Sequence, residues 1–240
     1  MKNTSKILSM LVIAAGISFP AMAQTAKEEQ TPAPMSAEAK AKTDADVDKK
    51  AADWVGALNL TDKDKASRVT AAISIHLKAV RDWNNDHSYT MVPAGINPIT
   101  GKNLSTLERQ VIINSSIPKT VHADLMAALR KDLTDEQVGL ILDKYTEGKV
   151  AFTLNGYKSI VPDLTPVEEA EILKNLQQAR EQAIDFKGSK QISMIFEIYK
   201  TRNEQYLNNN GRNWHKMYGN YTKMIIAKKA ADAAVKGNKN

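Results

Sequence analysis

Two short segments of this sequence place an aromatic ring among amide and charged side chains, which is the chemistry that sugar recognition requires. A sugar ring stacks an apolar face on an aromatic side chain, and its hydroxyls exchange hydrogen bonds with amides and charged groups. The first segment, Trp-Asn-Asn-Asp-His-Ser-Tyr, covers residues 83–89. Its candidate binding residues are Trp83, Asn84, Asp86, His87 and Tyr89.

The second segment, Asn-Asn-Asn-Gly-Arg-Asn-Trp-His, covers residues 208–215 and supplies Asn209, Arg212, Trp214 and His215 as candidates. A guanidinium such as that of Arg212 can form paired hydrogen bonds with the carboxylate of a uronic acid. The alternative for each of these aromatic rings is a place in the hydrophobic core.

Other site chemistry finds little support in the sequence. The chain has no cysteine and neither a Gly-x-Ser-x-Gly nor a His-Glu-x-x-His pattern, so no nucleophile, metal site or cofactor is expected. Glycoside hydrolysis needs two positioned carboxylates, and 27 acidic residues do not nominate a pair. His76 lies in an apolar stripe and is interpreted as a core histidine with a backbone partner. We expect a binding protein rather than an enzyme, with hydrolysis left open.

Amphipathic helices are predicted around both segments. Val69, Ile73, His76, Val80 and Trp83 follow one another at steps of four, three, four and three residues, which is the stripe of a single helix. Thr61 is its expected N-cap. Residues 86–104, rich in proline and glycine, are predicted to form a long loop, and such loops are often functional.

Helix starts are marked by capping boxes. Thr134 with Gln137 forms one, and Thr165 with Glu168 forms another that has Pro166 at the first helical position. Residues 150–161 alternate in polarity and are compatible with a short strand or a kinked helix. The predicted fold is therefore all-α, an irregular multi-helix bundle with that one ambiguous segment.

The N-terminus predicts export. Two lysines precede a short apolar run, and Ala21-Met22-Ala23 follows, which is the pattern of a signal peptide over residues 1–23 that is cleaved after Ala23. With no cysteine for lipid attachment, we expect a soluble periplasmic or secreted product without a transmembrane segment. Residues 24–50 are expected to be a disordered tether, and residues 51–236 a single helical domain.

Positive charge is concentrated in the last part of the chain. Residues 187–240 hold eleven Lys or Arg against Glu197, Glu204 and Asp232, whereas the whole chain has a net charge of +6. Export argues against a nucleic-acid partner, and it favours an acidic polysaccharide or an anionic surface. The alternative is a solvated helix face. The oligomeric state stays open.

Two resemblances follow from these residues. Leu133-Thr134-x-x-Gln137 resembles the LTxxQ motif of Spy/CpxP-like periplasmic proteins, which implies a chaperone or stress role. Between 133 and 211, Leu-Thr-x-Glu-Gln-Val, Val-Pro-x-Leu-Thr and Ile-Phe-x-x-Tyr-Lys resemble a secreted helical family of unknown function from polysaccharide-degrading bacteria, to which sugar binding is ascribed. The sequence departs from the second pattern at Thr201-Arg202-Asn203.

The resulting functional expectation is an exported, non-enzymatic carbohydrate-binding or accessory protein of polysaccharide utilisation. Its ligand would be an oligosaccharide or polysaccharide, with a preference for acidic sugars. A Spy/CpxP-like chaperone and a glycan hydrolase are the two alternatives.

Overall fold

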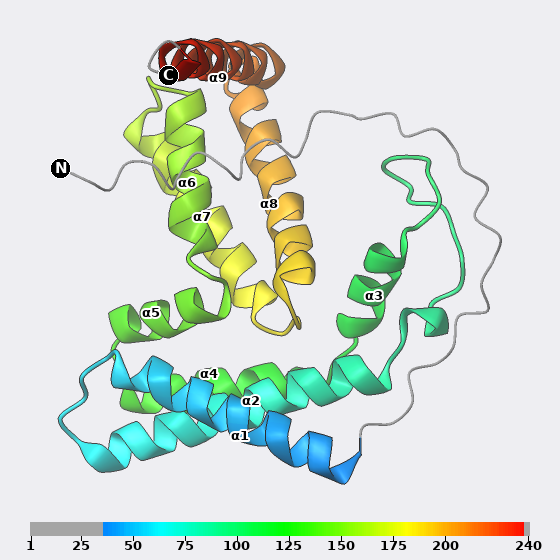
Figure 1. Ribbon diagram of the computed structural model, residues 1–240, viewed down its shortest axis with the longest axis vertical. Helices are drawn as coiled ribbons and strands as arrows, with labels where there is room; N and C mark the ends of the chain where they lie inside the picture. The colour runs from blue at the N-terminus through cyan, green and yellow to red at the C-terminus, as the bar shows by residue number, and fades with distance from the viewer. Residues whose placement is uncertain (1–35, 238–240) are drawn as a thin grey trace. The chain divides into compact units, whose positions relative to one another are not determined.

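The computed structural model of the chain describes residues 36–237, which are helical apart from turns and one extended loop (Figure 1). The predicted all-α class is confirmed. The helices are α1 (Ala37–Gly56), α2 (Lys63–Asp86), η1 (Tyr89–Met91), α3 (Thr106–Asn114), α4 (Lys119–Asp132), α5 (Asp135–Tyr145), α6 (Lys149–Ile160), α7 (Pro166–Ala183), α8 (Ser189–Asn209) and α9 (Trp214–Gly237). The predicted signal peptide, 1–23, and residues 24–35 of the predicted tether lie outside the described residues.

Buried apolar side chains form two separate clusters. The first core is built by α1, α2, α4 and α5, and its fully buried members include Val69, Ile73 and Leu129. Val69 and Ile73 belong to the predicted stripe of α2, in which His76 and Val80 are also buried. The first core therefore fixes the face that α2 turns inward.

The second core is built mainly by α3, α6, α7 and α8, with the start of α9 packed against it. Helices α7 and α8 lie side by side (Figure 1), and Ile172, Leu176 and Ile195 are completely or almost completely buried between them and their neighbours. Within residues 36–237, no helix has the length and apolarity needed to cross a membrane.

Helix α1 begins much earlier than expected, since residues 37–50 are helical rather than disordered. Ser36 caps its start by accepting a hydrogen bond from the Ala39 amide. This part of α1 is poor in large apolar side chains, but ion pairs hold it on α2. Asp44 pairs with Arg81 at 2.6 Å, and Asp48 pairs with Lys78 at 2.6 Å. The composition of 24–50 gave no sign of these cross-helix charges.

The predicted capping boxes at Thr134 and Thr165 are both confirmed, each with the side-chain and backbone hydrogen bonds of the complete motif. Helix α2 is capped by Asp62 instead of the expected Thr61. The Asp62 carboxylate accepts from the amides of Asp64 and Lys65, and it does so more strongly than a neutral hydroxyl would.

Residues 149–160 form α6, so the proposed strand is absent from this segment. Val150, Leu154, Tyr157 and Val161 are spaced by four, three and four residues and all pack into the second core. This helical stripe outweighs the local alternation of polarity. Gly148 starts the helix with φ of 67°, a left-handed conformation that favours glycine.

The loop predicted at 86–104 is present from His87 to Ser105, after α2 ends at Asp86. It contains η1 and an isolated bridge between Ile96 and Asn103. Asn97 holds the loop on α3 by donating to Glu108 Oε1 at 2.6 Å.

Candidate functional site

The first predicted segment lies where α2 ends, and the fold places two of its rings against each other. Trp83 and His87 are one helical turn apart, and their rings stack with centroids 3.6 Å apart and an interplanar angle of 15°. His87 Nδ1 bonds to the Trp83 carbonyl at 2.9 Å, which fixes the imidazole on the indole. Both side chains are half-buried. The pair therefore forms an ordered aromatic surface at the end of α2.

Asn84 belongs to a network of side-chain amides centred on Asn114. Asn114 Nδ2 donates to Asn84 Oδ1 at 2.8 Å and to Gln191 Oε1 at 2.9 Å, and Gln191 Nε2 donates to Asn84 Oδ1 at 2.9 Å. Asn114 Oδ1 accepts from Gln110 Nε2 at 2.9 Å. Asn114 is only 2% exposed, and all its polar atoms are bonded. This buried amide holds three partly exposed amides from α2, α3 and α8 in fixed positions.

Three other side chains complete the edge of this surface. Lys187 Nζ donates to Asn85 Oδ1 at 2.7 Å, and both residues are exposed. Partial desolvation of its ammonium and the nearby charge of Arg81 lower the pKa of Lys187. Asp86 is exposed beside Asn85. The edge thus carries an ammonium, a carboxylate and an amide next to the aromatic pair.

Tyr89 joins the site through its backbone amide and its ring. Its amide donates to Gln110 Oε1 at 2.9 Å, and its ring faces the Arg109 guanidinium at 5.1 Å. Gln110 also donates to the His87 carbonyl at 2.9 Å, so a single side chain anchors the start of the loop to α3. All five candidates of the first segment therefore lie at or beside one junction of helices, which we call the amide junction.

The second predicted segment is engaged in internal structure. Arg212 donates to both oxygens of Glu168, at 2.6 and 2.8 Å, and to the Asp163 carboxylate at 2.9 Å. The hydrogen bonds from Arg212 are the main reason why the pKa of Glu168 falls to about 2. Glu168 also completes the cap of α7. The guanidinium expected to meet a uronate is thus already paired with two carboxylates of its own chain.

Trp214 is a packing residue at the start of α9. It is half-buried against the second core, with its ring 5.2 Å from that of Tyr157 and 5.9 Å from that of Tyr218. Asn209 and His215 are exposed. The neighbouring Asn208, and not Asn209, accepts from the Trp214 amide. The second segment therefore ties α9 to α7 and α8.

A cluster of ionisable side chains that the sequence did not reveal lies between α2, α4 and the turn after α7. Asp185 Oδ1 is 2.9 Å from His76 Nε2, and Asp185 Oδ2 is 2.9 Å from His122 Nδ1. His76 thus binds a carboxylate and not the expected backbone group. Asp185 and His122 lie 109 and 46 residues from His76 in the sequence. The one local sign of this cluster is therefore a histidine in an apolar stripe.

The charges of this cluster reinforce one another. Burial alone would raise the pKa of Asp185, but the hydrogen bonds from His122 and His76 lower it overall. The Asp185 hydrogen bond also raises the pKa of His122, with a smaller contribution from Glu181. Within residues 36–237, no group of His, Asp and Glu side chains has the arrangement of a metal site.

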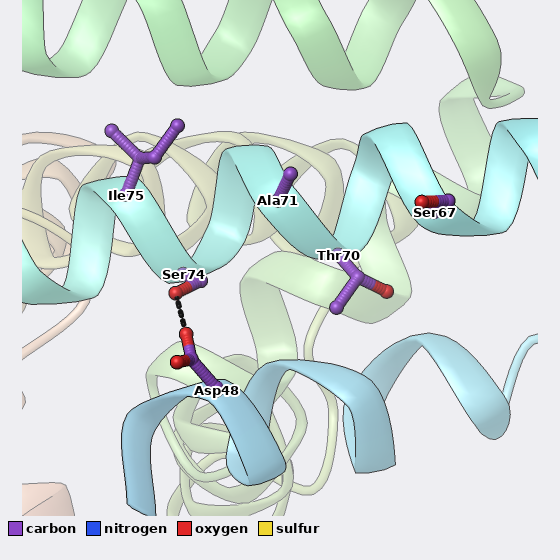
Figure 2. A pocket seen from close by; sticks show the side chains of 6 residues that line it. All are labelled: Asp48, Ser67, Thr70, Ala71, Ser74 and Ile75. Atoms are coloured by element: carbon purple, nitrogen blue, oxygen red, sulfur yellow. Dashed lines mark hydrogen bonds between the residues drawn. The ribbon is translucent and has the colours of Figure 1, made fainter. Parts of the chain in front are cut away.

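Two surface hollows lie away from the amide junction. The first, of about 440 Å³, is lined by Asp48 of α1 and by Ser67, Thr70, Ala71, Ser74 and Ile75 of α2. Figure 2 shows the Ser74 hydroxyl pointing at the Asp48 carboxylate, with which it is hydrogen-bonded. The second, of about 270 Å³, lies between α2 and α4 beside His76. Neither hollow is lined by Trp83 or His87.

The architecture and the amide junction define an all-helical protein with an ordered polar surface where three helices meet. Comparison with known families then places the chain. It belongs to the family described as Protein of unknown function (DUF3826), which matches residues 44–227. This range begins inside α1, in agreement with the helical structure of residues that composition had assigned to a tether. No curated protein matches the sequence.

Proposed function

We propose that this chain is an exported, non-enzymatic carbohydrate-binding protein of polysaccharide utilisation, and that the amide junction is its binding surface. The observation that carries the proposal is the stacked pair of Trp83 and His87 beside the amides that Asn114 holds in place. Export rests on the signal-peptide pattern of residues 1–23.

The aromatic pair supplies the stacking face. Stacking between Trp83 and His87 leaves little rotational freedom to either ring, so a sugar meets a surface that loses little conformational entropy on binding. The indole Nε1 is directed at the Ile113 carbonyl at 3.4 Å, which also restrains it. A rigid ring of this kind is what stacking on the apolar face of a pyranose requires.

The amides supply hydroxyl recognition. Asn84 Oδ1 accepts two hydrogen bonds from Asn114 and Gln191, which orients its side chain. The Asn84 Nδ2 group has no hydrogen-bond partner among residues 36–237 and is not among the buried polar atoms that lack one. It is therefore open to a ligand oxygen. Asn85 Oδ1 accepts from Lys187, and its Nδ2 group has no hydrogen-bond partner among the described residues. Such fixed donors discriminate among hydroxyl patterns, because an unmatched donor loses its hydration without gaining a partner.

The local charge favours an acidic sugar. Burial and the nearby Arg81 guanidinium lower the pKa of Lys187, while Asp82 acts in the opposite direction. A uronate carboxylate would form a charge-assisted hydrogen bond with the Lys187 ammonium, which donates to the neutral amide of Asn85 in the structure. We therefore assign to Lys187 the role expected of Arg212, because among residues 36–237 the Lys187 ammonium bonds only to a neutral amide, whereas Arg212 is paired with carboxylates.

Isothermal titration against neutral and uronate oligosaccharides tests the proposal. We expect binding of a uronate oligosaccharide that Lys187→Ala weakens about tenfold and Trp83→Phe about threefold, the factors of a lost charged hydrogen bond and a smaller ring. Trp54→Phe, in the first core, is the matched tryptophan control and keeps the wild-type affinity. No heat with any sugar, or equal losses in Trp54→Phe and Trp83→Phe, would contradict the proposal.

The two alternative functions, a glycan hydrolase and a Spy/CpxP-like chaperone, can be tested with the same purified protein. Release of reducing ends from the titrated oligosaccharide would indicate a hydrolase. Suppression of the aggregation of an unfolded client, without sugar binding, would indicate the Spy/CpxP-like role. The structure gives the LTxxQ residues a local purpose, since Thr134 and Gln137 form the capping box of α5.

A further inference from the structure

Asp185 stands between two residues that belong to different cores. Ile184 is buried in the first core, and Phe186 is buried in the second. The turn that carries Asp185 follows the end of α7 at Ala183 and precedes α8 at Ser189. Whatever holds this turn in place therefore also joins the two cores.

The Asp185 carboxylate is held on the first-core side by two histidines. His76 comes from α2 and is 2% exposed, while His122 comes from α4 and has 27% of its side chain exposed. Each imidazole meets a different carboxylate oxygen at 2.9 Å. We call this arrangement, His76, Asp185 and His122, the imidazole clasp.

Other charged and titratable groups surround the clasp. Glu181 of α7 is 3.7 Å from His122 Nε2, and it is also 3.7 Å from Arg130 of α4. Tyr145 of α5 packs edge-on against His76, with centroids 5.3 Å apart, and its buried hydroxyl has no partner among the described residues. Asp124 of α4 lines the hollow beside His76. Two carboxylates, those of Asp185 and Glu181, thus face His122 and stabilise its protonated form.

The amide junction crosses between the same two sets of helices. Asn84 and Asn85 at the end of α2 bond to Gln191 of α8 and to Lys187 of the turn before it. Lys187 is two residues from Asp185. A displacement of the turn carrying Asp185 would therefore move Lys187 and Gln191 away from Asn84 and Asn85.

We propose that the imidazole clasp is a pH-responsive fastener between the two cores, and that it sets the geometry of the amide junction. The second half of this statement rests on the proposed sugar-binding function. Protonated His122 forms an ion pair with Asp185 and fastens the turn, whereas neutral His122 leaves a weaker hydrogen bond.

The direction follows from the two groups that shift. The pKa of His122 is raised by Asp185, so its contribution is fully present below the ordinary histidine value of 6.5 and is lost as the pH rises through the raised value. The pKa of Asp185 is lowered, so its contribution is lost only when the pH falls below 3.8 and through that lowered value. The clasp is therefore tightest in mildly acidic solution.

Distance measurement between spin labels tests the fastener directly. The chain has no cysteine, so Ala127→Cys on α4 and Gln205→Cys on α8 introduce the only two labelling sites, both at exposed positions. We expect one narrow distance distribution at pH 5.5 and a broader one at pH 8.0, with the displaced population about fivefold larger, as for a modest ion pair. Asp185→Asn should remove this pH dependence. Asp143→Asn, which removes the contact of α5 with Arg180 of α7, should keep it.

Identical distributions at both pH values, or a pH dependence that persists in Asp185→Asn, would overturn the proposal. Titration with a uronate oligosaccharide forms the second arm, in which wild-type affinity is higher at pH 5.5 and the affinity of Asp185→Asn is not. His87 lies in the binding surface and is unchanged in both proteins, so their difference isolates the clasp. Absence of any sugar binding would refute the proposed function, while the distances alone would still decide the fastener.

Discussion

Replacing Asn114 with alanine tests whether the amide junction is built around that buried side chain. The substitution removes three hydrogen bonds, to Asn84, Gln191 and Gln110, at 2.8, 2.9 and 2.9 Å. A hydrogen bond contributes about 1 kcal/mol net, and the partners here lose it inside a half-buried site. We therefore expect Asn114→Ala to lower the free energy of unfolding by about 3 kcal/mol.

Urea unfolding followed by circular dichroism at 222 nm measures this loss, together with a fall in melting temperature of about 10 °C. Asn155→Ala is the matched control, because Asn155 is exposed on α6 and its side chain makes no hydrogen bond within the described residues. It should change stability by no more than about 0.5 kcal/mol. A loss below 1 kcal/mol for Asn114→Ala would refute the central position of this residue.

Three further predictions concern single contacts. Glu168→Gln should lower the free energy of unfolding by about 2 kcal/mol at neutral pH, because Arg212 stabilises the charged form of Glu168. In urea unfolding, this difference between the two proteins should vanish as the pH falls from 4.5 through about 2, and a pH-independent difference would contradict the prediction. Gly148→Ala should cost about 1 kcal/mol by thermal unfolding, because φ is 67° at this position, although no atom beyond the adjoining residues lies within 4 Å of the added methyl. A neutral result would mean that the turn relaxes. His122→Gln should destabilise more at pH 6 than at pH 9, because the pKa of His122 is raised, and an equal effect at both values would exclude an ion pair with Asp185.

Local signals in the sequence predicted the helices well. Thr134 and Thr165 were identified because a capping box is read within four residues. The α2 stripe was identified because helical periodicity is also local. The start of α1 was missed, since ion pairs to Arg81 and Lys78 on another helix hold it in place. The pattern of residues 37–50 does not reveal that the partners of Asp48 and Asp44 are Lys78 and Arg81, which lie 30 and 37 residues away.

The candidate residues divide along the same line. Trp83 and His87 were predictable as a pair because they are one turn apart. The amides that orient Asn84 come from Asn114 and Gln191, which are 30 and 107 residues distant. Arg212 looked available for a ligand, because the carboxylate that binds it, Glu168, was interpreted only as a helix cap. Charge type can be read from a sequence, but the identity of the partner is set by tertiary packing.

Side-chain NMR during a titration with a uronate oligosaccharide tests the proposed binding surface most directly. The indole Nε1–H of Trp83 and the side-chain amides of Asn84, Asn85 and Gln191 report on the amide junction, while the indole of Trp54 reports on the first core. We expect saturable shifts in the junction resonances, with Trp54 unchanged. Binding that moves Trp214 and leaves Trp83 and the junction amides in place would contradict the assignment.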